Sequence, residues 1–341
     1  MTSHIGIIGG GNISGTHARA AREIDGLEIA AVYGFNQDKL TLLGQQYGAQ
    51  VYTDFDLFLE HRPMDLVAIG SPSGLHATQG IAAARRGLHV LVEKPIDINL
   101  QSADALIAEC NKASVKLGVF FQDRTAPDLS RLKQLIDGGS LGRPILVNAR
   151  VKWYRAAEYY ADSHWRGTFA LDGGGALINQ GVHTVDLLIW LMGDVARVQA
   201  KAITALHQIE VEDTVVAALE FRNGAIGTLE AATSVYPGYP RRIELTGSEG
   251  TIVLEGDHIT AADLRAPLDD LRLMKADESQ IRASSPVVAD VSGHRRIMED
   301  FLQAIQRNGR PLCDGHEGRR SLAVVAAIYE SSRLGQAVNL S

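Results

Sequence analysis

Short apolar segments alternate with segments of helical periodicity along the first third of the chain. The expected strands are residues 4–8, 27–33, 66–69, 89–92 and 117–121. The expected helices are residues 16–24, 39–47, 54–59, 79–86 and 103–113. This alternation predicts βαβ units and an α/β fold, in which helices cover both faces of a parallel sheet. Right-handed crossovers would give a doubly wound Rossmann sheet.

The rest of the chain has longer segments of strand character. They are residues 145–153, 195–206, 214–221, 225–233, 241–246 and 251–254. Helices are expected at residues 126–137, 176–191, 294–307 and 317–333. The turns at Asn223-Gly224 and at residues 247–250 join neighbouring strands as hairpins, which predicts a mostly antiparallel, open sheet.

The change of pattern falls at residues 122–127, and a length of 341 residues suits two domains. We therefore expect a dinucleotide-binding domain over residues 1–123 and a second α/β domain over residues 124–341. Residues 264–292 have the least regular pattern and are expected to form a long surface loop.

Composition narrows the choice of partners and of compartment. The net charge of −7 gives no basic footprint for nucleic acid or an anionic membrane. No apolar stretch is long enough to span a bilayer, and no signal peptide is recognisable at the start. The two cysteines, Cys110 and Cys313, lie far apart in sequence and outside any metal-binding pattern. A cytoplasmic protein without a metal centre is expected.

The first expected strand ends in a glycine-rich loop. Residues 9–14 read Gly-Gly-Gly-Asn-Ile-Ser and open the first helix, which is the context that gives the dinucleotide fingerprint its meaning. Gly9 would make the tight turn and Gly11 would let a pyrophosphate approach the helix start, beside Asn12 and Ile13. Ser14 replaces the usual third glycine or alanine.

The second strand bears on the choice between NAD and NADP. An NAD site usually has Asp or Glu where this chain has Gly34, so no carboxylate would repel a 2′-phosphate. Asn36 follows, and Lys39 is the nearest cation. The sequence therefore allows either NAD or NADP.

Two further loops follow expected parallel strands and should reach the same ligand-binding edge. Ser71, Pro72 and His76 are expected to shape the cofactor pocket, with His76 in a structural role. Glu93 and Lys94 precede Pro95 at the end of another strand. Lys94 could hydrogen-bond a substrate hydroxyl and stabilise alkoxide character, although a solvated surface lysine is the simpler interpretation.

A second cluster of polar residues follows a glycine run at residues 173–175. Asn179 and His183 are four residues apart and should share one helix face, with Asp186 close to that face. An imidazole is suited to taking a hydroxyl proton near neutral pH, and Asn179 could position the hydroxyl. A helix-face histidine with a satisfied hydrogen bond is the alternative.

Aromatic residues and an arginine precede this cluster. Trp153, Tyr154, Trp165 and Arg166 could stack on a sugar ring and bind its hydroxyl or acidic groups. A buried aromatic patch beneath the sheet explains each of them equally well.

These motifs together resemble the Gfo/Idh/MocA oxidoreductases, which act on sugars, inositols and sugar nucleotides. The glycine loop, the loop at 71–76, Glu93-Lys94-Pro95 and the segment 173–183 occur in the order and approximate spacing of that family, and the resemblance covers essentially the whole chain. It implies a Rossmann domain that binds NAD or NADP, and a second domain whose sheet forms homodimers or homotetramers. The family lysine corresponds to Lys94 and the family histidine to His183. The usual aspartate corresponds to Asn179, a departure that leaves His183 as the only evident base.

Three functions remain open at this stage. The first is hydride transfer between nicotinamide and a hydroxyl or keto carbon of a sugar-like substrate, with Lys94, His183 and Asn179 in the catalytic roles. The second is a glycosidase that oxidises its substrate transiently with bound NAD. The third is a regulator that senses NAD(P) without turnover, which the loss of the family aspartate keeps open.

Overall fold

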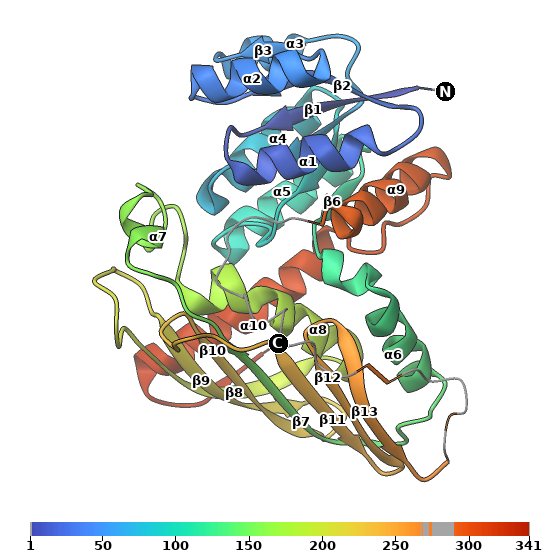
Figure 1. Ribbon diagram of the computed structural model, residues 1–341, viewed down its shortest axis with the longest axis vertical. Helices are drawn as coiled ribbons and strands as arrows, with labels where there is room; N and C mark the ends of the chain where they lie inside the picture. Colours follow the sequence, from blue (N-terminus) through green and yellow to red (C-terminus); the bar gives the residue numbers. More distant parts are fainter. Residues whose placement is uncertain (1, 267, 269–272, 275–289, 341) are drawn as a thin grey trace. The chain divides into compact units, whose positions relative to one another are not determined.

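The computed structural model describes residues 2–266, 268, 273–274 and 290–340 (Figure 1). The chain forms two compact units. One comprises residues 1–122 and 286–319, and the other comprises residues 123–285 and 320–341. The sequence predicts a single boundary near residue 123, whereas the first unit also includes a later segment, residues 286–319.

The first unit contains a six-stranded parallel sheet of order β3-β2-β1-β4-β5-β6. Its strands are β1 (Ser3–Ile8), β2 (Leu27–Tyr33), β3 (Gln50–Tyr52), β4 (Leu66–Ile69), β5 (His89–Val92) and β6 (Leu117–Val119). Every residue of β4 is buried, because helices cover both faces of the sheet. The strand order reverses between β1 and β4, and ligands of such sheets bind outside the carboxyl ends of the strands at this point.

The helices of this unit follow the βαβ pattern. They are α1 (Asn12–Arg22), α2 (Gln37–Tyr47), α3 (Phe55–Glu60), α4 (His76–Arg85), α5 (Leu100–Lys112) and α9 (Ser292–Gln306). The last of these comes from the far end of the sequence and packs against α1 (Figure 1). Phe301 of α9 lies over β6, where a Cβ on Gly118 would be 2.8 Å from its ring. This close packing explains why residues 290–319 belong to the first unit.

The second unit contains an eight-stranded sheet of order β13-β12-β11-β7-β10-β9-β8-β14. Its strands are β7 (Pro144–Lys152), β8 (Val195–Ile203), β9 (Thr214–Phe221), β10 (Ile226–Ala232), β11 (Arg242–Gly247), β12 (Gly250–Glu255), β13 (His258–Leu264) and β14 (Val338–Asn339). Only β7 and β10 pair in parallel, and both expected hairpins are present. Buried and exposed residues alternate along β9, so one face of the sheet is covered and the other is open.

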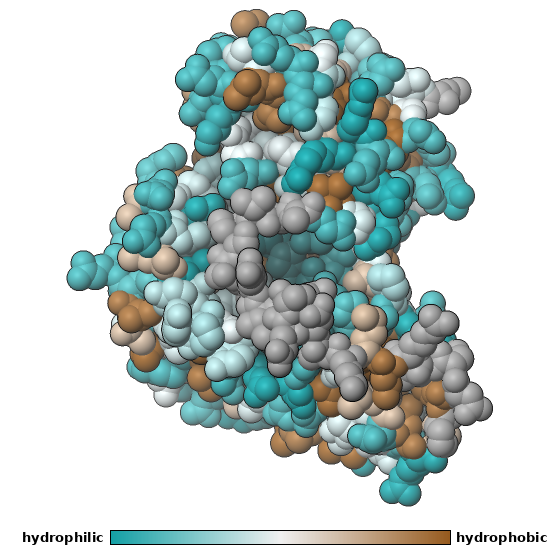
Figure 2. Space-filling model, viewed as in Figure 1, coloured by the Kyte–Doolittle hydropathy of each residue, from teal (hydrophilic) through white to brown (hydrophobic). Residues whose placement is uncertain are grey.

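The helices of the second unit are α6 (Pro127–Asp137), the four-residue α7 (Glu158–Ala161), α8 (Val182–Met192) and the greater part of α10 (Gly315–Leu334). The expected helix at 176–191 begins differently, because Ala176–Gly181 form a π-helical turn, η3, ahead of α8. Most of the expected loop at 264–292 lies outside the described residues. Hydrophilic residues predominate on the face shown in Figure 2, with hydrophobic residues interspersed.

Candidate functional site

The loop after β1 has the geometry that a dinucleotide pyrophosphate requires. Gly9 has φ of +123°, and a Cβ there would lie 2.7 Å from both the Gly70 carbonyl oxygen and Ser14 Oγ. Gly11 is the N-cap of α1, and a Cβ on it would meet nothing within 4 Å. No side chain caps α1, and its first turn, opened by Asn12 and Ile13, contains no acidic residue. Its free N–H groups and positive dipole end therefore suit an anion.

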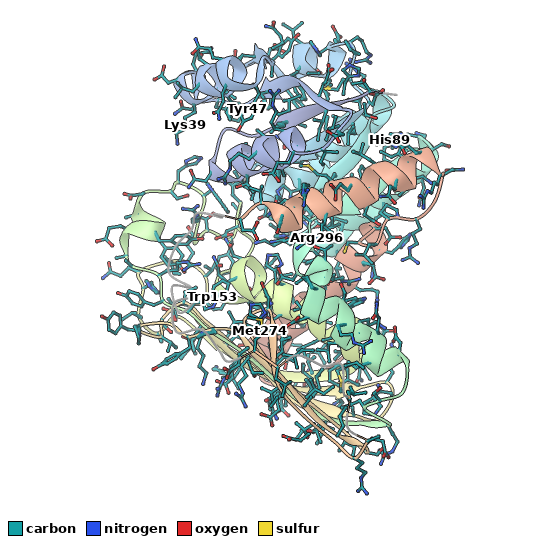
Figure 3. The ribbon with its side chains drawn as sticks, turned by 45° about the vertical axis from the view of Figure 1, so that its right-hand side comes forward. Lys39, Tyr47, His89, Trp153, Met274 and Arg296 are labelled. Carbon is teal, nitrogen blue, oxygen red and sulfur yellow. The ribbon has the colours of Figure 1, made fainter. Side chains whose placement is uncertain are left out.

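The end of β2 is shaped by its fit against this loop. A Cβ on Gly34 would lie 3.1 Å from the Gly10 nitrogen, so the absence of a side chain lets the two segments approach. Asn36 Oδ1 accepts a hydrogen bond from the Lys39 N–H at 3.0 Å and caps α2. Lys39 itself is exposed (Figure 3). Asn36 thus supports the helix, and Lys39 is the exposed cation of this turn.

The loop after β4 is tied to the turn after β5. Ser71 Oγ donates to Gln79 Oε1 at 2.6 Å. The ring of His76 is buried, with Nδ1 2.8 Å from the Pro95 carbonyl oxygen and Nε2 3.0 Å from that of Ser71. Pro72 precedes a short 3-10 turn. These contacts give His76 a structural role between the two loops.

Glu93 lies at the centre of a buried cluster beneath Lys94. Its Oε1 is 2.9 Å from Nε2 of His17, on α1, and 3.3 Å from Nε2 of His294, on α9. Burial would raise the pKa of Glu93, but its hydrogen bonds with the two imidazoles hold it well below the usual range. Burial lowers the pKa of His17. We therefore assign an ionised carboxylate and a neutral, donating His17.

This cluster fixes the start of the Glu93-Lys94-Pro95 turn. Oε2 of Glu93 accepts the Lys94 N–H at 3.2 Å, and the Lys94 side chain is half-buried. Among the described residues, Glu93, His17 and His294 form the one group with possible metal-ligand geometry, their ligand atoms lying within 4.8 Å of one another. The hydrogen bond with His17 and the ion-pair contact with His294 account for the same arrangement.

In the second unit, Glu212 holds the glycine run that precedes η3. Its carboxylate accepts the N–H of Gly175 at 2.9 Å and that of Leu177 at 2.8 Å. Its backbone oxygen accepts the N–H of Ala176 at 3.0 Å, and a Cβ on Gly175 would come within 1.8 Å of that oxygen. The glycine run therefore allows the chain to pass against Glu212, which satisfies the first N–H groups of the turn.

Asn179 is part of a polar network on this turn. Its Nδ2 donates to Asp172 Oδ1 at 2.7 Å, and its Oδ1 accepts from Gln180 Nε2 at 3.2 Å. Asp172 is buried and also accepts the Gly167 N–H at 2.9 Å. Asp172 thus supplies a carboxylate next to Asn179, the residue that stands where the family has an aspartate.

His183 lies at the start of α8, one turn after Asn179. Its Nδ1 is 3.9 Å from Asp123 Oδ2. One turn further along, Asp186 forms a buried bidentate pair with Arg124, with distances of 2.7 and 2.6 Å. This pair anchors α8 beneath His183.

Trp153, which is labelled in Figure 3, and Tyr154 directly follow β7. Trp153 belongs to a cluster of aromatic rings and guanidinium groups. The Arg155 guanidinium carbon lies 5.3 Å from the ring centroids of Trp153 and Tyr159. That of Arg166 lies 4.3 Å from Tyr159 and 5.4 Å from Trp165.

Gln180 joins this cluster to the site helix. It donates to the Tyr159 hydroxyl at 3.0 Å and accepts from Arg155 NH2 at 3.3 Å, while it also contacts Asn179. Tyr154 packs edge-on against Tyr236 at 5.3 Å. The predicted substrate residues Trp153, Trp165 and Arg166 are thus brought together with Asn179.

Sequence reasoning did not assign several residues of these networks. They are His17, His294, Asp123, Arg155, Asp172 and Glu212. Arg155 could have been found, because it follows Trp153-Tyr154 directly. Asp172 lies only seven positions before Asn179. The remaining four act through partners distant in sequence, such as His17 and Glu93, which are 76 positions apart.

The fold and the glycine loop define an NAD-binding oxidoreductase of the Rossmann type. Residues 3–121 match the family described as "Oxidoreductase family, NAD-binding Rossmann fold", and residues 129–253 match the "GFO/IDH/MocA C-terminal domain". The chain belongs to the Gfo/Idh/MocA family of oxidoreductases, as its motifs predicted.

Curated relatives align over nearly the whole chain. D-apiose dehydrogenase of Paraburkholderia graminis is 27% identical over 98% of this chain and 88% of its own length. Myo-inositol 2-dehydrogenase of Thermotoga maritima is 26% identical over 98% of both chains. The WlbA dehydrogenase of Bordetella pertussis, solved with NADH and UDP-GlcNAcA, is 32% identical with a TM-score of 0.89, over 100% of this chain and 99% of that one.

The names of these relatives describe dehydrogenases, which supports the oxidoreductase over the glycosidase and the regulator. This chain is accordingly an NAD(P)-dependent oxidoreductase. No helix in the described part of the chain is both long and apolar enough to cross a membrane.

Proposed function

We propose that the chain transfers a hydride between NAD and a secondary hydroxyl, or the corresponding ketone, of a sugar that bears an anionic group. The observation that carries this proposal is the cluster around Tyr159, which Gln180 connects to Asn179. Aromatic faces bind the apolar faces of sugar rings, and guanidinium groups bind carboxylates or phosphates in a bidentate manner. Arg155 and Arg166 place two such groups against one tyrosine ring.

The proposed roles follow from the chemistry of each side chain. In the oxidation, the substrate carbon loses a hydride and its hydroxyl loses a proton. His183 takes the proton through Nε2, since Nδ1 is the nitrogen near Asp123. The ammonium group of Lys94 suits hydrogen bonding to a substrate oxygen and stabilising the negative charge that develops on it. Asn179 positions the hydroxyl, with its amide orientation fixed by Asp172 and Gln180.

When bound, the nicotinamide would supply the hydride acceptor. The residues proposed to form its dinucleotide site are Gly9, Gly11, Asn12, Ile13, Gly34, Asn36, Lys39, Ser71, Pro72, His76, Glu93 and Lys94. Among them, His76 and Glu93 would act by positioning the loops after β4 and β5. The open space over Gly11 and the uncapped start of α1 support this assignment. Gly34 offers no carboxylate, so we propose that NADP is tolerated as well.

The test is a substrate panel followed through NADH absorbance. It pairs neutral sugars and inositols with uronic acids and sugar nucleotides, a choice supported by the Bordetella pertussis relative that was solved with UDP-GlcNAcA. We expect turnover with an anionic sugar and a large loss of kcat in Lys94→Ala and His183→Ala. Arg166→Met should raise KM for the anionic substrate more than for its neutral analogue. NADH binding without turnover of any member, or equal KM effects on both substrates, would contradict the proposal.

We also propose a cytoplasmic homodimer or homotetramer that binds neither nucleic acid nor membrane. Cys110 and Cys313 are both buried as free thiols, which suits a reducing compartment. The open face of the second sheet exposes apolar side chains, among them Val216 and Ile226 at 52% and 56%. Light scattering on the purified protein tests the assembly, and a monomer at micromolar concentration would contradict it.

A further inference from the structure

Asp123 brings a carboxylate to His183 from outside the site helix. It lies in the short turn η2 (Gln122–Thr125), and its Oδ2 is 3.9 Å from Nδ1 of His183, within ion-pair range. Both side chains are shielded from solvent, with 17% and 13% of their surfaces exposed. The two charges would therefore interact more strongly than they would at an open surface.

Arg241 fixes the position of this carboxylate. Its NH1 donates to Asp123 Oδ2, and its NH2 donates to Asp257 and, at 3.2 Å, to the Gly256 carbonyl oxygen. The arginine is buried, so few water molecules can compete with these partners for its guanidinium. Burial lowers the pKa of Arg241, but the charges of Asp123 and Asp257 raise it by more. The pKa is therefore raised overall, and the guanidinium stays charged.

A carboxylate near an imidazole favours a proton on the ring, and Asp123 is such a neighbour of His183. Asp123 and Asp257 both form ion pairs with the Arg241 guanidinium. On α8 itself, Asp186 is balanced by Arg124 from η2. Further away, on α6, Asp128 contacts His258 at 3.3 Å.

We propose that Asp123 is a positioning residue for the reaction: it orients the imidazole of His183 through Nδ1 and stabilises the imidazolium formed when that ring accepts the substrate proton. This assignment rests on the proposed role of His183 as the base. Asp123 would thus supply the negative charge that the aspartate supplies in the family motif. Asn179, which stands at that motif position, is neutral, and its amide is hydrogen-bonded to Asp172 and Gln180.

The test compares Asp123→Asn with Asp257→Asn in the full-length protein. Both variants remove one carboxylate from Arg241, but only Asp123 is an ion-pair neighbour of His183. The His183 ring is titrated by NMR, with His183→Gln used to assign its signal. We expect its midpoint to fall by about one pH unit in Asp123→Asn, a tenfold change in proton affinity, and to move much less in Asp257→Asn. Equal midpoints in the two variants would overturn the proposal.

The pH profile of kcat/KM supplies the second measurement. Its acidic limb should move to lower pH in Asp123→Asn by the same amount as the NMR midpoint, and its plateau should fall because a weaker base accepts the proton. A changed NMR midpoint in a protein without turnover of any sugar would leave the Asp123–His183 pairing in place and refute the proposed function alone. If Asp123→Asn does not fold, Asp123→Glu keeps an anion for Arg241 and moves it by one methylene group. A changed midpoint in that variant supports the pairing, and an unchanged one contradicts it.

Discussion

The Tyr329 hydroxyl donates a hydrogen bond to Glu212 Oε1 at 2.9 Å and joins helix α10 to the segment that precedes β9. The same hydroxyl accepts the Ile178 N–H at 3.2 Å. Burial and the neighbouring Glu212 raise the pKa of Tyr329 well above its usual value, so the phenol remains a donor at every practical pH. Glu212 and Tyr329 therefore hold the turn on which Asn179 lies.

Tyr329→Phe should lower the free energy of unfolding by about 1–3 kcal/mol, because two buried polar groups lose their partner. Denaturant unfolding measures the change. Tyr236→Phe is the matched control: its side chain is 77% exposed, and we expect a change within about 0.5 kcal/mol. Equal effects of the two substitutions would show that the contact with Glu212 contributes nothing measurable.

Gly9 and Gly11 should respond differently to alanine. Gly9→Ala places a Cβ 2.7 Å from the Gly70 carbonyl oxygen at φ of +123°, so both folding of the loop and NADH binding should suffer. Gly11→Ala meets no protein atom within 4 Å, so we expect an unchanged melting temperature and an affinity for NADH at least about tenfold weaker. Nicotinamide fluorescence and thermal unfolding separate the two effects.

The exposed Gly309 serves as the control for the loop substitutions, because a Cβ there also meets nothing within 4 Å. Gly309→Ala should alter neither property. Unimpaired NADH binding by Gly11→Ala would contradict the pyrophosphate site at the start of α1.

Local patterns were sufficient to predict much of this architecture. The alternation of apolar and helical segments predicted the parallel sheet, and Asn223-Gly224 predicted the β9–β10 hairpin, because both signals lie within a few neighbouring residues. The family motifs likewise indicated Lys94 and His183 as candidate residues.

Features that depend on distant partners were not predictable. The return of α9 to the first unit depends on packing against α1, nearly 300 positions earlier in the chain. The π-helical turn before α8 has the composition of an ordinary helix start, and its register is set by Glu212. Asp123 lies 60 positions from His183, and nothing in its own neighbourhood indicates that contact.

The buried pair Arg124–Asp186 should contribute far more to stability than an exposed pair. Both side chains are almost fully buried, at 2% and 1% exposure, and Ser321 Oγ donates to Asp186 Oδ1 at 3.0 Å. Asp186→Asn leaves a buried guanidinium without its counter-charge, at a cost of about 3–5 kcal/mol. Chemical denaturation measures this loss.

The exposed pair Arg197–Glu220 provides the comparison. These side chains lie 3.3 Å apart at 49% and 57% exposure. Glu220→Gln should cost less than about 1 kcal/mol. A similar cost for Asp186→Asn would show that Arg124 finds another partner or solvent when the carboxylate charge is removed.

Acid should destabilise the first unit in two stages through His17 and Glu93. Burial lowers the pKa of His17 below its ordinary value of 6.5, so its contribution is complete above pH 6.5 and declines as the pH falls through the lower folded value. The imidazoles hold the pKa of Glu93 well below 4.5, so its contribution is present above pH 4.5 and is lost as the pH falls further. The melting temperature should therefore decline first below pH 6.5 and again below pH 4.5.

Glu93→Gln should remove the second decline and lower stability at neutral pH by about 1–3 kcal/mol, because the hydrogen bonds of the carboxylate with His17 and with the Lys94 N–H are weakened. If Glu93→Gln keeps the native pH dependence of the melting temperature below pH 4.5, other carboxylates cause the loss of stability in acid.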